Sequence, residues 1–255
     1  MGTKIIGLLA AMPDEIRPLL KRVGKVERGR AGQFREYRFT IGDIKVRLVE
    51  SGMGMERAAA AAEILSADSP VAVISFGFGG AALPGLAAGD LVVGTKSLLY
   101  NGGKFRQHEG VDHALADDMV RHLAGGPFQA AAGTIITSRL ILNKKELAPA
   151  LPPALERPVL DMETAAIAAV MNSRGIPLVA LRAVSDDAAE ELAFSLDEFT
   201  DHNLTIQPAK VLLTILRKPW IIPQLVRLAR NSRLAGETLA SAVTAAVPAI
   251  ASRLA

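Results

Sequence analysis

The sequence predicts an α/β domain whose largely parallel β-sheet is covered by helices on both faces. Three observations support this prediction. Half of the 255 residues are hydrophobic, which is enough for a substantial core. Continuous apolar runs of strand length recur along the chain, as expected for strands that are buried on both faces. These runs alternate with segments of helical periodicity.

The alternation of strands and helices starts with residues 5–12, an apolar run that predicts a buried strand. After Pro13 the apolar residues recur at helical spacing, so this strand leads into a helix. The later patterns predict strands over residues 37–41, 44–48, 71–76, 90–95, 133–137 and 178–184, and helices over residues 55–65 and 162–172. The first two of these strands flank Gly42-Asp43 and alternate with period 2, which predicts a hairpin. Residues 100–126 are either an active-site loop or a variable surface excursion.

The composition divides the chain into a domain of residues 1–203 and a helical extension of residues 204–255. The extension carries a net charge of +6 and the rest of the chain −3, so the domain offers no basic face for nucleic acid. A helix is expected over residues 204–216, followed by a second helix from Gln224 and a last, alanine-rich helix. The extension combines basic amphipathic helices with Trp220, and this composition is compatible with two roles. The extension is either a docked helical appendage or an element that lies at a membrane surface or binds an apolar ligand.

The sequence contains no cysteine, which excludes disulfides, cysteine-bound metals and a thiol nucleophile. This composition favours a cytoplasmic protein. The four histidines lack metal-ligand spacing such as His-Glu-x-x-His, so we expect them to be surface or structural residues and predict no metal site. Catalysis would therefore depend on acidic side chains and backbone groups.

A glycine-rich stretch, Gly77-Phe78-Gly79-Gly80, follows the strand predicted over residues 71–76. The backbone N–H groups of such a stretch can line a ligand pocket at the carboxyl end of a strand. No Gly-Lys-Ser/Thr follows, and the third glycine of a dinucleotide fingerprint is missing, so neither a P-loop nor a dinucleotide site is predicted. The alternative is a tight turn that needs small residues.

Three acids stand where predicted strands and helices meet. Asp186 directly follows a buried strand, where a partly desolvated carboxyl suits a general acid, although Asp187 could take the same role. Glu163 at a helix start could accept two hydrogen bonds from a vicinal diol such as that of a ribose. Glu15 lies where the first strand gives way to a helix and could orient a water molecule. Each acid could instead only cap or stabilise the N-terminus of a helix.

Five motifs occur in order along the chain. They are Ile6-Gly7-Leu8-Leu9-Ala10-Ala11-Met12-Pro13-Asp14-Glu15, Ser51-Gly52-Met53-Gly54, Ser75-Phe76-Gly77-Phe78-Gly79-Gly80 with Gly89-Asp90-Leu91-Val92-Val93, Asp161-Met162-Glu163-Thr164-Ala165-Ala166, and Arg182-Ala183-Val184-Ser185-Asp186. Together they resemble the nucleoside phosphorylase and nucleosidase family, and within it the methylthioadenosine/S-adenosylhomocysteine nucleosidases. The resemblance implies a three-layer α/β sandwich around a twisted mixed β-sheet, cleavage of an N-glycosidic bond to a purine, and a homodimer.

The resemblance also implies a role for each motif residue. Asp186 would protonate or hydrogen-bond N7 of the leaving adenine, and Glu15 would position the attacking water. Glu163 would bind the ribose, on which Met162 would pack. The nucleoside site would be completed by Ser51, Met53, the backbone of Phe78 and Gly79, Ser185, and Ile141 and Leu142 beside the purine. No cofactor is implied.

The nucleophile and the substrate stay open at this stage. The phosphorolytic members of the family use inorganic phosphate as a co-substrate, and Arg17 and Arg57 are candidate phosphate ligands. Met12-Pro13-Asp14-Glu15 resembles the hydrolytic loop, which favours water. The extension of residues 204–255 resembles the tails of the hopanoid-associated phosphorylases, so peripheral membrane contact and an adenosyl lipid substrate compete with soluble methylthioadenosine and S-adenosylhomocysteine. A nucleoside-binding protein that has lost catalysis is the third alternative.

Overall fold

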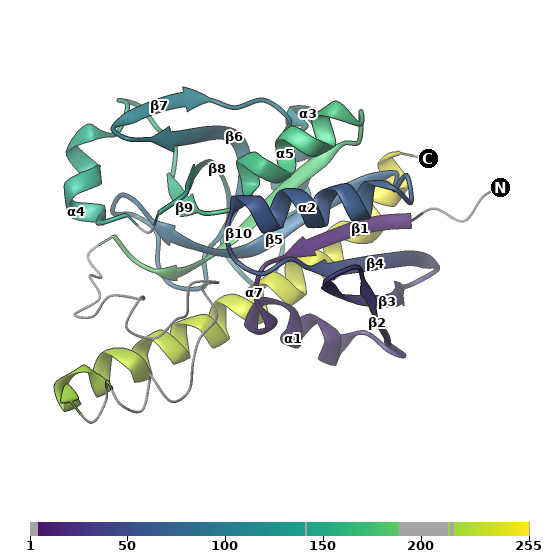
Figure 1. The fold of residues 1–255 in the computed structure, drawn as a ribbon, viewed down its shortest axis with the longest axis horizontal. Helices are drawn as coiled ribbons and strands as arrows, with labels where there is room; N and C mark the ends of the chain where they lie inside the picture. The colour runs from purple at the N-terminus through teal and green to yellow at the C-terminus, as the bar shows by residue number, and fades with distance from the viewer. Residues whose placement is uncertain (1–4, 141, 189–213, 215–216, 255) are drawn as a thin grey trace.

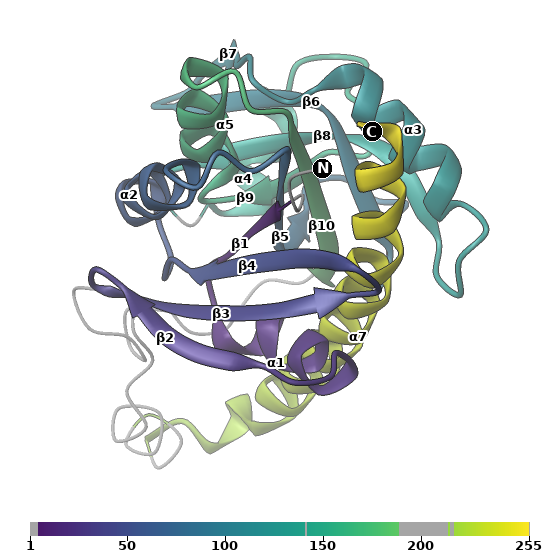
Figure 2. The same ribbon diagram turned by 90° about the vertical axis from the view of Figure 1, so that its right-hand side faces the viewer.

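The computed structural model describes residues 5–140, 142–188, 214 and 217–254. The described strands form one ten-stranded sheet with helices on both faces (Figures 1 and 2). The strands are β1 (Ile5–Ala10), β2 (Glu27–Ala31), β3 (Phe34–Ile41), β4 (Ile44–Glu50), β5 (Ala72–Ala81), β6 (Leu91–Asn101), β7 (Lys104–Gln107), β8 (Ala130–Ser138), β9 (Val159–Asp161) and β10 (Leu178–Asp186). The α-helices are α1 (Pro13–Arg22), α2 (Met55–Ser66), α3 (His113–Leu123), α4 (Lys144–Leu147), α5 (Thr164–Ser173) and α7 (Ile222–Arg253), and short 3₁₀ helices cover Ala148–Ala150 and Pro219–Ile221.

Two hydrophobic clusters, one on each face of the sheet, give the protein three layers. Successive side chains of β1 point to opposite faces, so Ile6 and Leu8 join one cluster and Leu9 the other. The first cluster lies under α1, α3 and α7, and the second lies under α2 and α5 (Figure 2). The three-layer α/β sandwich with a mixed sheet is therefore confirmed.

The sheet topology brings several strand ends to one edge. The strand order is β10-β6-β8-β9-β5-β1-β4-β3-β2, with β7 paired to β6. β1 lies between β4 and β5 and is parallel to both, and β5 is parallel to β10. β10 also pairs with β6, so β5, β9, β8, β6 and β10 close into a ring. The carboxyl ends of β1, β5 and β10 therefore share one edge, which is where ligands bind in α/β sheets.

The predicted strands and helices before residue 188 are confirmed, and most differences lie at their ends. The strand predicted over residues 71–76 continues as β5 through Ala81, so the glycine-rich stretch is neither a loop nor a tight turn. Residues 100–126, which matched no pattern, contain β7 and α3. No sequence pattern predicted β2, because four of its five residues are exposed and an edge strand of this kind lacks an apolar face.

Helix α7 is one continuous helix of 32 residues, whereas two helices were expected from Gln224 onward. Its second half packs into the core, where Leu239, Val243 and Ile250 are fully buried. Gly236 lets α7 approach α1 closely, since a Cβ atom there would lie 3.0 Å from Cγ of Pro18. This half of α7 is therefore part of the sandwich. The expected domain boundary between residues 203 and 204, and nearly all of the helix predicted before residue 217, lie outside the described residues.

The composition of α7 alone would also suit a membrane span. Among the described helices it is the one that is long and apolar enough, with a mean hydropathy of 1.4 over an 18-residue window. Within the protein, 61% of that window is buried. Packing against the sheet therefore accounts for the apolar character of this helix.

Candidate active site

Glu15 is buried at the start of α1, directly after β1. Its Oε2 accepts hydrogen bonds from the backbone N–H groups of Ala11 and Met12, each at 2.8 Å. Its Oε1 accepts a third bond from the N–H of Phe78 on β5, also at 2.8 Å. Burial raises the pKa of the Glu15 carboxyl, although the three amides act in the opposite direction. Glu15 is thus a rigidly held carboxyl that is more basic than an exposed one.

The glycines of β5 leave room for acidic side chains. A Cβ atom at Gly77 would lie 2.8 Å from Oε1 of Glu15, and one at Gly80 would lie 2.9 Å from Oδ2 of Asp186. Side chains that pass this close to a strand are one reason for glycine in its interior. The glycine-rich stretch therefore serves the acids beside it, which sequence reasoning had not anticipated.

Glu163 precedes α5 and joins it to the loop before α2. Its Oε1 accepts a hydrogen bond from the N–H of Gly54 at 2.8 Å, and its Oε2 accepts one from the N–H of Met162 at 3.2 Å. Gly54 has a φ of +97°, a conformation that glycine adopts readily. Burial, followed by the negative charge of Asp161, raises the pKa of Glu163 to about 7. Both protonation states of Glu163 are therefore accessible near neutral pH.

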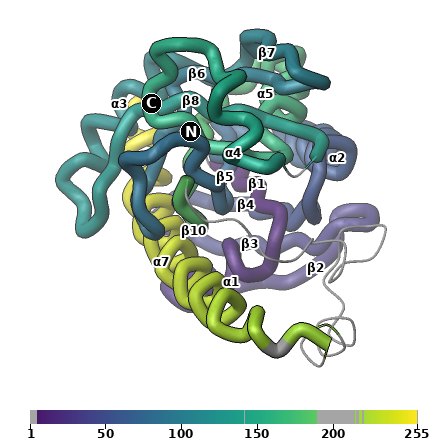
Figure 3. Tube along the Cα trace, turned by 90° about the vertical axis from the view of Figure 1, so that its left-hand side faces the viewer, coloured from purple at the N-terminus to yellow at the C-terminus, as the bar shows by residue number. Residues whose placement is uncertain are grey.

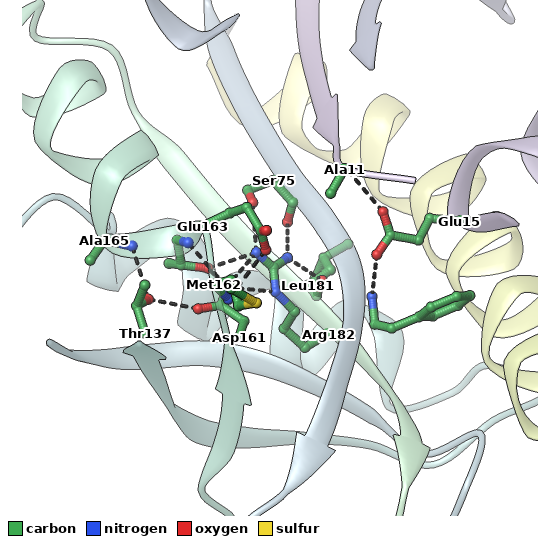
Figure 4. Close-up of polar contacts among 12 residues, drawn as sticks. Ala11, Glu15, Ser75, Thr137, Asp161, Met162, Glu163, Ala165, Leu181 and Arg182 are labelled. Atoms are coloured by element: carbon green, nitrogen blue, oxygen red, sulfur yellow. Dashed lines mark hydrogen bonds and ion pairs between the residues drawn. The ribbon is translucent and has the colours of Figure 1, made fainter. Parts of the chain in front are cut away.

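Arg182 and Asp161 form a buried ion pair that sequence reasoning did not assign to the site. Oδ2 of Asp161 accepts hydrogen bonds from Nη2 and Nε of Arg182 at 2.7 and 3.0 Å (Figure 4). The hydroxyls of Thr137 and Thr164 donate to the same carboxylate, and Nη2 of Arg182 also donates to Oγ of Ser75 at 2.9 Å. This network ties β5, β8, β9, α5 and β10 together. One feature of the sequence could have revealed this network: Arg182 lies inside an apolar strand, and a buried guanidinium requires an acidic partner.

A small hollow lies where these groups meet. The residues that line it are Leu9, Ala10, Ala11, Glu15, Ser51, Ser75, Phe76, Gly77, Glu163, Ile167 and Arg182. Of the residues predicted for the site, the structure thus brings Glu15, Glu163 and Ser51 together around one hollow.

Asp186 ends β10 in an ion pair with Lys144, the first residue of α4. Its Oδ2 faces Nζ of Lys144, and its Oδ1 accepts a hydrogen bond from the hydroxyl of Ser185 at 2.6 Å. The Asp186 side chain is 28% exposed, so a ligand can reach it. In the sheet Asp186 is paired with Gly80, which places it at the same edge as the hollow although it is not among the described residues that line it. The sequence had not indicated its lysine partner.

Three other predicted residues contribute through the backbone. The N–H group of Phe78 donates to Glu15, and that of Met162 donates to Glu163. Gly79 lies against Arg182, since a Cβ atom at Gly79 would be 3.3 Å from Cβ of the arginine. These positions are therefore parts of the frame that holds the charged side chains.

The remaining predicted residues are Met53, Ile141 and Leu142. Met53 and Leu142 are half-buried, and they are not among the described residues that line the hollow. Ile141 lies outside the described residues. The substrate contacts expected for these three residues stay predictions.

The two arginines considered as phosphate ligands have other partners. Arg17 is exposed and forms an ion pair with Asp14 at 3.0 Å. Arg57 donates from Nε to the backbone carbonyl of Ser51 at 2.9 Å, and its guanidinium lies 5.8 Å from the centroid of the Phe34 ring. Neither arginine lines the hollow.

The arrangement offers three carboxyl groups at one sheet edge. Glu163 can accept hydrogen bonds from ligand hydroxyls, Glu15 can hold a water molecule and take its proton, and Asp186 can bind a polar group from the more exposed side. Among the described residues, no cluster of three or more histidine or acidic side chains could hold a metal ion.

Comparison with known proteins gives a family and a set of relatives. Residues 5–217 match the family model described as the Phosphorylase superfamily. The 5′-methylthioadenosine/S-adenosylhomocysteine nucleosidase of Listeria monocytogenes is 28% identical over 232 residues, which are 83% of this chain and 98% of that protein. The enzyme of the same name from an Exiguobacterium species is 26% identical over 230 residues, which are 84% of this chain and 97% of that protein.

Solved structures show the same fold. The structure of the 5′-methylthioadenosine/S-adenosylhomocysteine nucleosidase of Neisseria meningitidis, in complex with methylthio-immucillin-A, has a TM-score of 0.71 at 21% identity. It covers 96% of this chain and 99% of its own. The futalosine hydrolase of Helicobacter pylori has a TM-score of 0.73 at 17% identity and covers 97% of this chain and 98% of its own. The resemblance carried by the five sequence motifs is confirmed, and the chain belongs to the Phosphorylase superfamily.

Proposed function

We propose that this protein is a nucleosidase that hydrolyses the N-glycosidic bond of a 5′-substituted adenosine and releases adenine. Relatives that match most of the chain bear the name of such an enzyme, with methylthioadenosine and S-adenosylhomocysteine as substrates. The single observation that carries the proposal is the pairing of the buried Glu15 with the half-buried Glu163 around one hollow.

The chemistry of the reaction matches the three acids. When the C1′–N9 bond breaks, its electron pair leaves with the purine and positive charge develops on the sugar, so the site must stabilise both fragments. Asp186 binds N7 of the departing purine, and Glu163 accepts hydrogen bonds from the ribose hydroxyls. Glu15 holds the water and takes its proton as the water oxygen bonds to C1′. The raised pKa of Glu15, which results from burial, supports this role because it strengthens the carboxylate as a base.

Water is the proposed nucleophile because the described part of the hollow provides no available cation for phosphate. Among the described residues Arg182 is the one basic residue that lines it, and the guanidinium is already bound to Asp161, Ser75 and Thr164. Phosphate at this place would need a cation whose donors point into the site. Inorganic phosphate as a co-substrate is therefore the less supported alternative.

Adenine release tests the proposal directly. The purified protein is incubated with methylthioadenosine, S-adenosylhomocysteine, adenosine and inosine, each with and without phosphate, beside the variant Asp186→Asn. We expect release from the two thio-nucleosides without phosphate, and a loss of about 10²- to 10⁴-fold in the variant. Strict dependence on phosphate would make the enzyme a phosphorylase. Binding of adenine without turnover of any nucleoside would support the non-catalytic alternative.

A second candidate substrate, an adenosyl lipid as in hopanoid-associated relatives, is favoured by the first turns of α7 and the segment before it. Trp220 and Val226 are 68% and 64% exposed, and Arg230 and Arg233 are exposed on the same helix. Exposed apolar side chains beside cations suit the surface of an anionic membrane. Flotation with vesicles of phosphatidylcholine and phosphatidylserine tests this contact. Binding should be lost in Trp220→Ser/Val226→Ser and retained in Arg174→Ser, a change at the exposed residue that follows α5.

We further propose that the protein is a cytoplasmic homodimer, as the family resemblance implies. Leu140 follows the end of β8 and is 72% exposed, and a partner subunit would cover such an apolar side chain. Light scattering after size-exclusion chromatography should give twice the chain mass of 26.9 kDa. A mass equal to that of one chain would contradict the proposal.

A further inference from the structure

Lys144 is a buried lysine beside the proposed site that the reaction outlined above does not use. Its side chain is only 8% exposed, whereas Lys145 and Glu146 on the same helix are exposed. The side chain of Asn143 caps the helix by accepting hydrogen bonds from the N–H groups of Lys145 and Glu146. The start of α4 is thus fixed so that Lys144 faces inward.

Three acceptors surround the Lys144 ammonium, and all three come from the end of β10. They are Oδ2 of Asp186, the backbone carbonyl of Asp186 at 3.1 Å and the backbone carbonyl of Asp187 at 2.7 Å. A protonated lysine has three N–H donors and no acceptor, so this environment matches the charged form. Gly80 completes the site, because a Cβ atom there would lie 3.1 Å from Cε and 3.3 Å from Nζ of Lys144.

The ion pair between Lys144 and Asp186 affects which group can donate a proton to the leaving purine. With Lys144 on Oδ2 and the Ser185 hydroxyl on Oδ1, both oxygens of Asp186 accept hydrogen bonds, as expected of a carboxylate. A carboxylate has no proton to donate. The acidic hydrogen in contact with it is on the Lys144 ammonium.

We propose that Lys144 supplies the proton for the leaving base and that Asp186 relays it. This inference rests on the proposed function. Lys144 first passes a proton to Oδ2 of Asp186, and Asp186 then delivers a proton to N7 as the C1′–N9 bond breaks and its electron pair moves into the purine. The water loses its proton to Glu15 as its oxygen bonds to C1′. After release of adenine, Lys144 regains a proton from solvent and Glu15 returns one, so the enzyme ends in its starting state.

The charges around Lys144 determine how the reaction should depend on pH. β10 contributes Asp186 and, just beyond its end, Asp187, and β5 contributes the uncharged Gly80. With Lys144 present, Asp186 need not carry a proton in the resting enzyme. Without it, Asp186 can donate only when it carries a proton of its own, which becomes rarer as the pH rises.

The pH profile of kcat for adenine release therefore tests the proposal in the variant Lys144→Met. Titration of Glu163, whose pKa is about 7, affects the wild type and the variant alike, so the two profiles are compared as a ratio. The ratio of the variant kcat to the wild-type kcat should fall steadily from about pH 6 to about pH 8, where ordinary carboxyls are ionised. The control Lys145→Met, an exposed neighbour, should follow the wild type. A lysine that only positions Asp186 would lower kcat by the same factor at every pH, and a parallel profile would overturn the proposal.

A substrate that needs no proton separates the relay from a folding defect. 4-Nitrophenolate leaves without protonation, so the 4-nitrophenyl glycoside of 5-methylthioribose should be hydrolysed equally by the wild type and Lys144→Met. Unequal rates on this substrate would contradict the relay. If the wild type releases no adenine from any nucleoside, the proposed function fails and the relay with it. If the wild type is active and the variant profile is parallel, the relay alone fails.

Discussion

Gly77 and Glu15 are in such close contact that residue 77 has to be glycine: a Cβ atom there would lie 2.8 Å from Oε1 of the glutamate. Real Cβ atoms do not approach a carboxylate oxygen this closely. The carboxylate cannot swing away without cost, because three backbone amides hold it. The position of the proposed base thus depends on a missing side chain on β5.

Gly77→Ala should therefore damage activity more than stability. The added methyl group displaces Glu15 while the strand, which has ordinary extended geometry at this residue, is retained. A displacement of about 1 Å can cost about 10²-fold in kcat. Adenine release and thermal unfolding are measured together, with Gly29→Ala on β2 as the control, since a Cβ atom there meets nothing within 4 Å. Equal kcat values in the two variants would show that Glu15 is not constrained in this way.

Glu163→Gln should change how stability depends on pH. The folded protein holds the Glu163 proton with a pKa of about 7, against a usual value of 4.5, because of burial and the charge of Asp161. Between these values the folded state binds more protons than the unfolded state, so the free energy of unfolding falls as pH rises. The ionised carboxyl then costs about 3 kcal/mol at alkaline pH.

Removal of this carboxyl removes that cost. The stability of Glu163→Gln relative to the wild type should therefore increase from about pH 4.5 to about pH 7 and be constant outside this range. Urea unfolding at a series of pH values gives the difference. A difference that does not vary with pH would mean that Glu163 titrates alike in the folded and unfolded protein.

The Arg182–Asp161 pair should be required for folding rather than for one chemical step. Arg182→Met leaves the Asp161 carboxylate buried without its cation, which typically costs about 3–5 kcal/mol. The double variant Arg182→Met/Asp161→Asn should regain part of this loss, because no unpaired charge remains. Denaturant unfolding measures both, beside Arg174→Met, whose exposed pair with Glu63 should contribute about 1 kcal/mol or less. A single variant as stable as this control would refute the assignment.

The sequence predicts the features of this structure that depend on neighbouring residues, but not the contacts between residues that are far apart along the chain. β1, α1 and the helix-starting position of Glu15 follow from a local pattern that includes Pro13. Arg182 is 21 residues from Asp161, and Lys144 is 42 residues from Asp186. A local sequence pattern cannot show that two residues this far apart are in contact. The sequence therefore predicts Asp186 as a site residue but not its partner Lys144.

The glycines of β5 and helix α7 illustrate a second limit. A tight turn at Gly77 and Gly80 was left open as an alternative because local rules associate glycine with turns, whereas the reason for both is a side chain from another element. In α7 a basic, Trp-flanked pattern changes to an alanine-rich one near residue 235, which locally resembles two helices. The second half is continuous with the first because the sheet buries its small residues.

The integration of α7 into the core leads to the last prediction. Leu239 is fully buried in the cluster that also contains β1 and α1, while Val226, thirteen residues earlier on the same helix, is 64% exposed. Leu239→Ala should therefore lower the free energy of unfolding by about 2–5 kcal/mol. Val226→Ala should change it by about 0.5 kcal/mol or less. Unfolding in urea distinguishes the two, and a single transition is expected in both variants because α7 and the sheet share one core. A separate early transition in Leu239→Ala would instead make the C-terminal part an independently folding extension, as the division at residues 203 and 204 assumed.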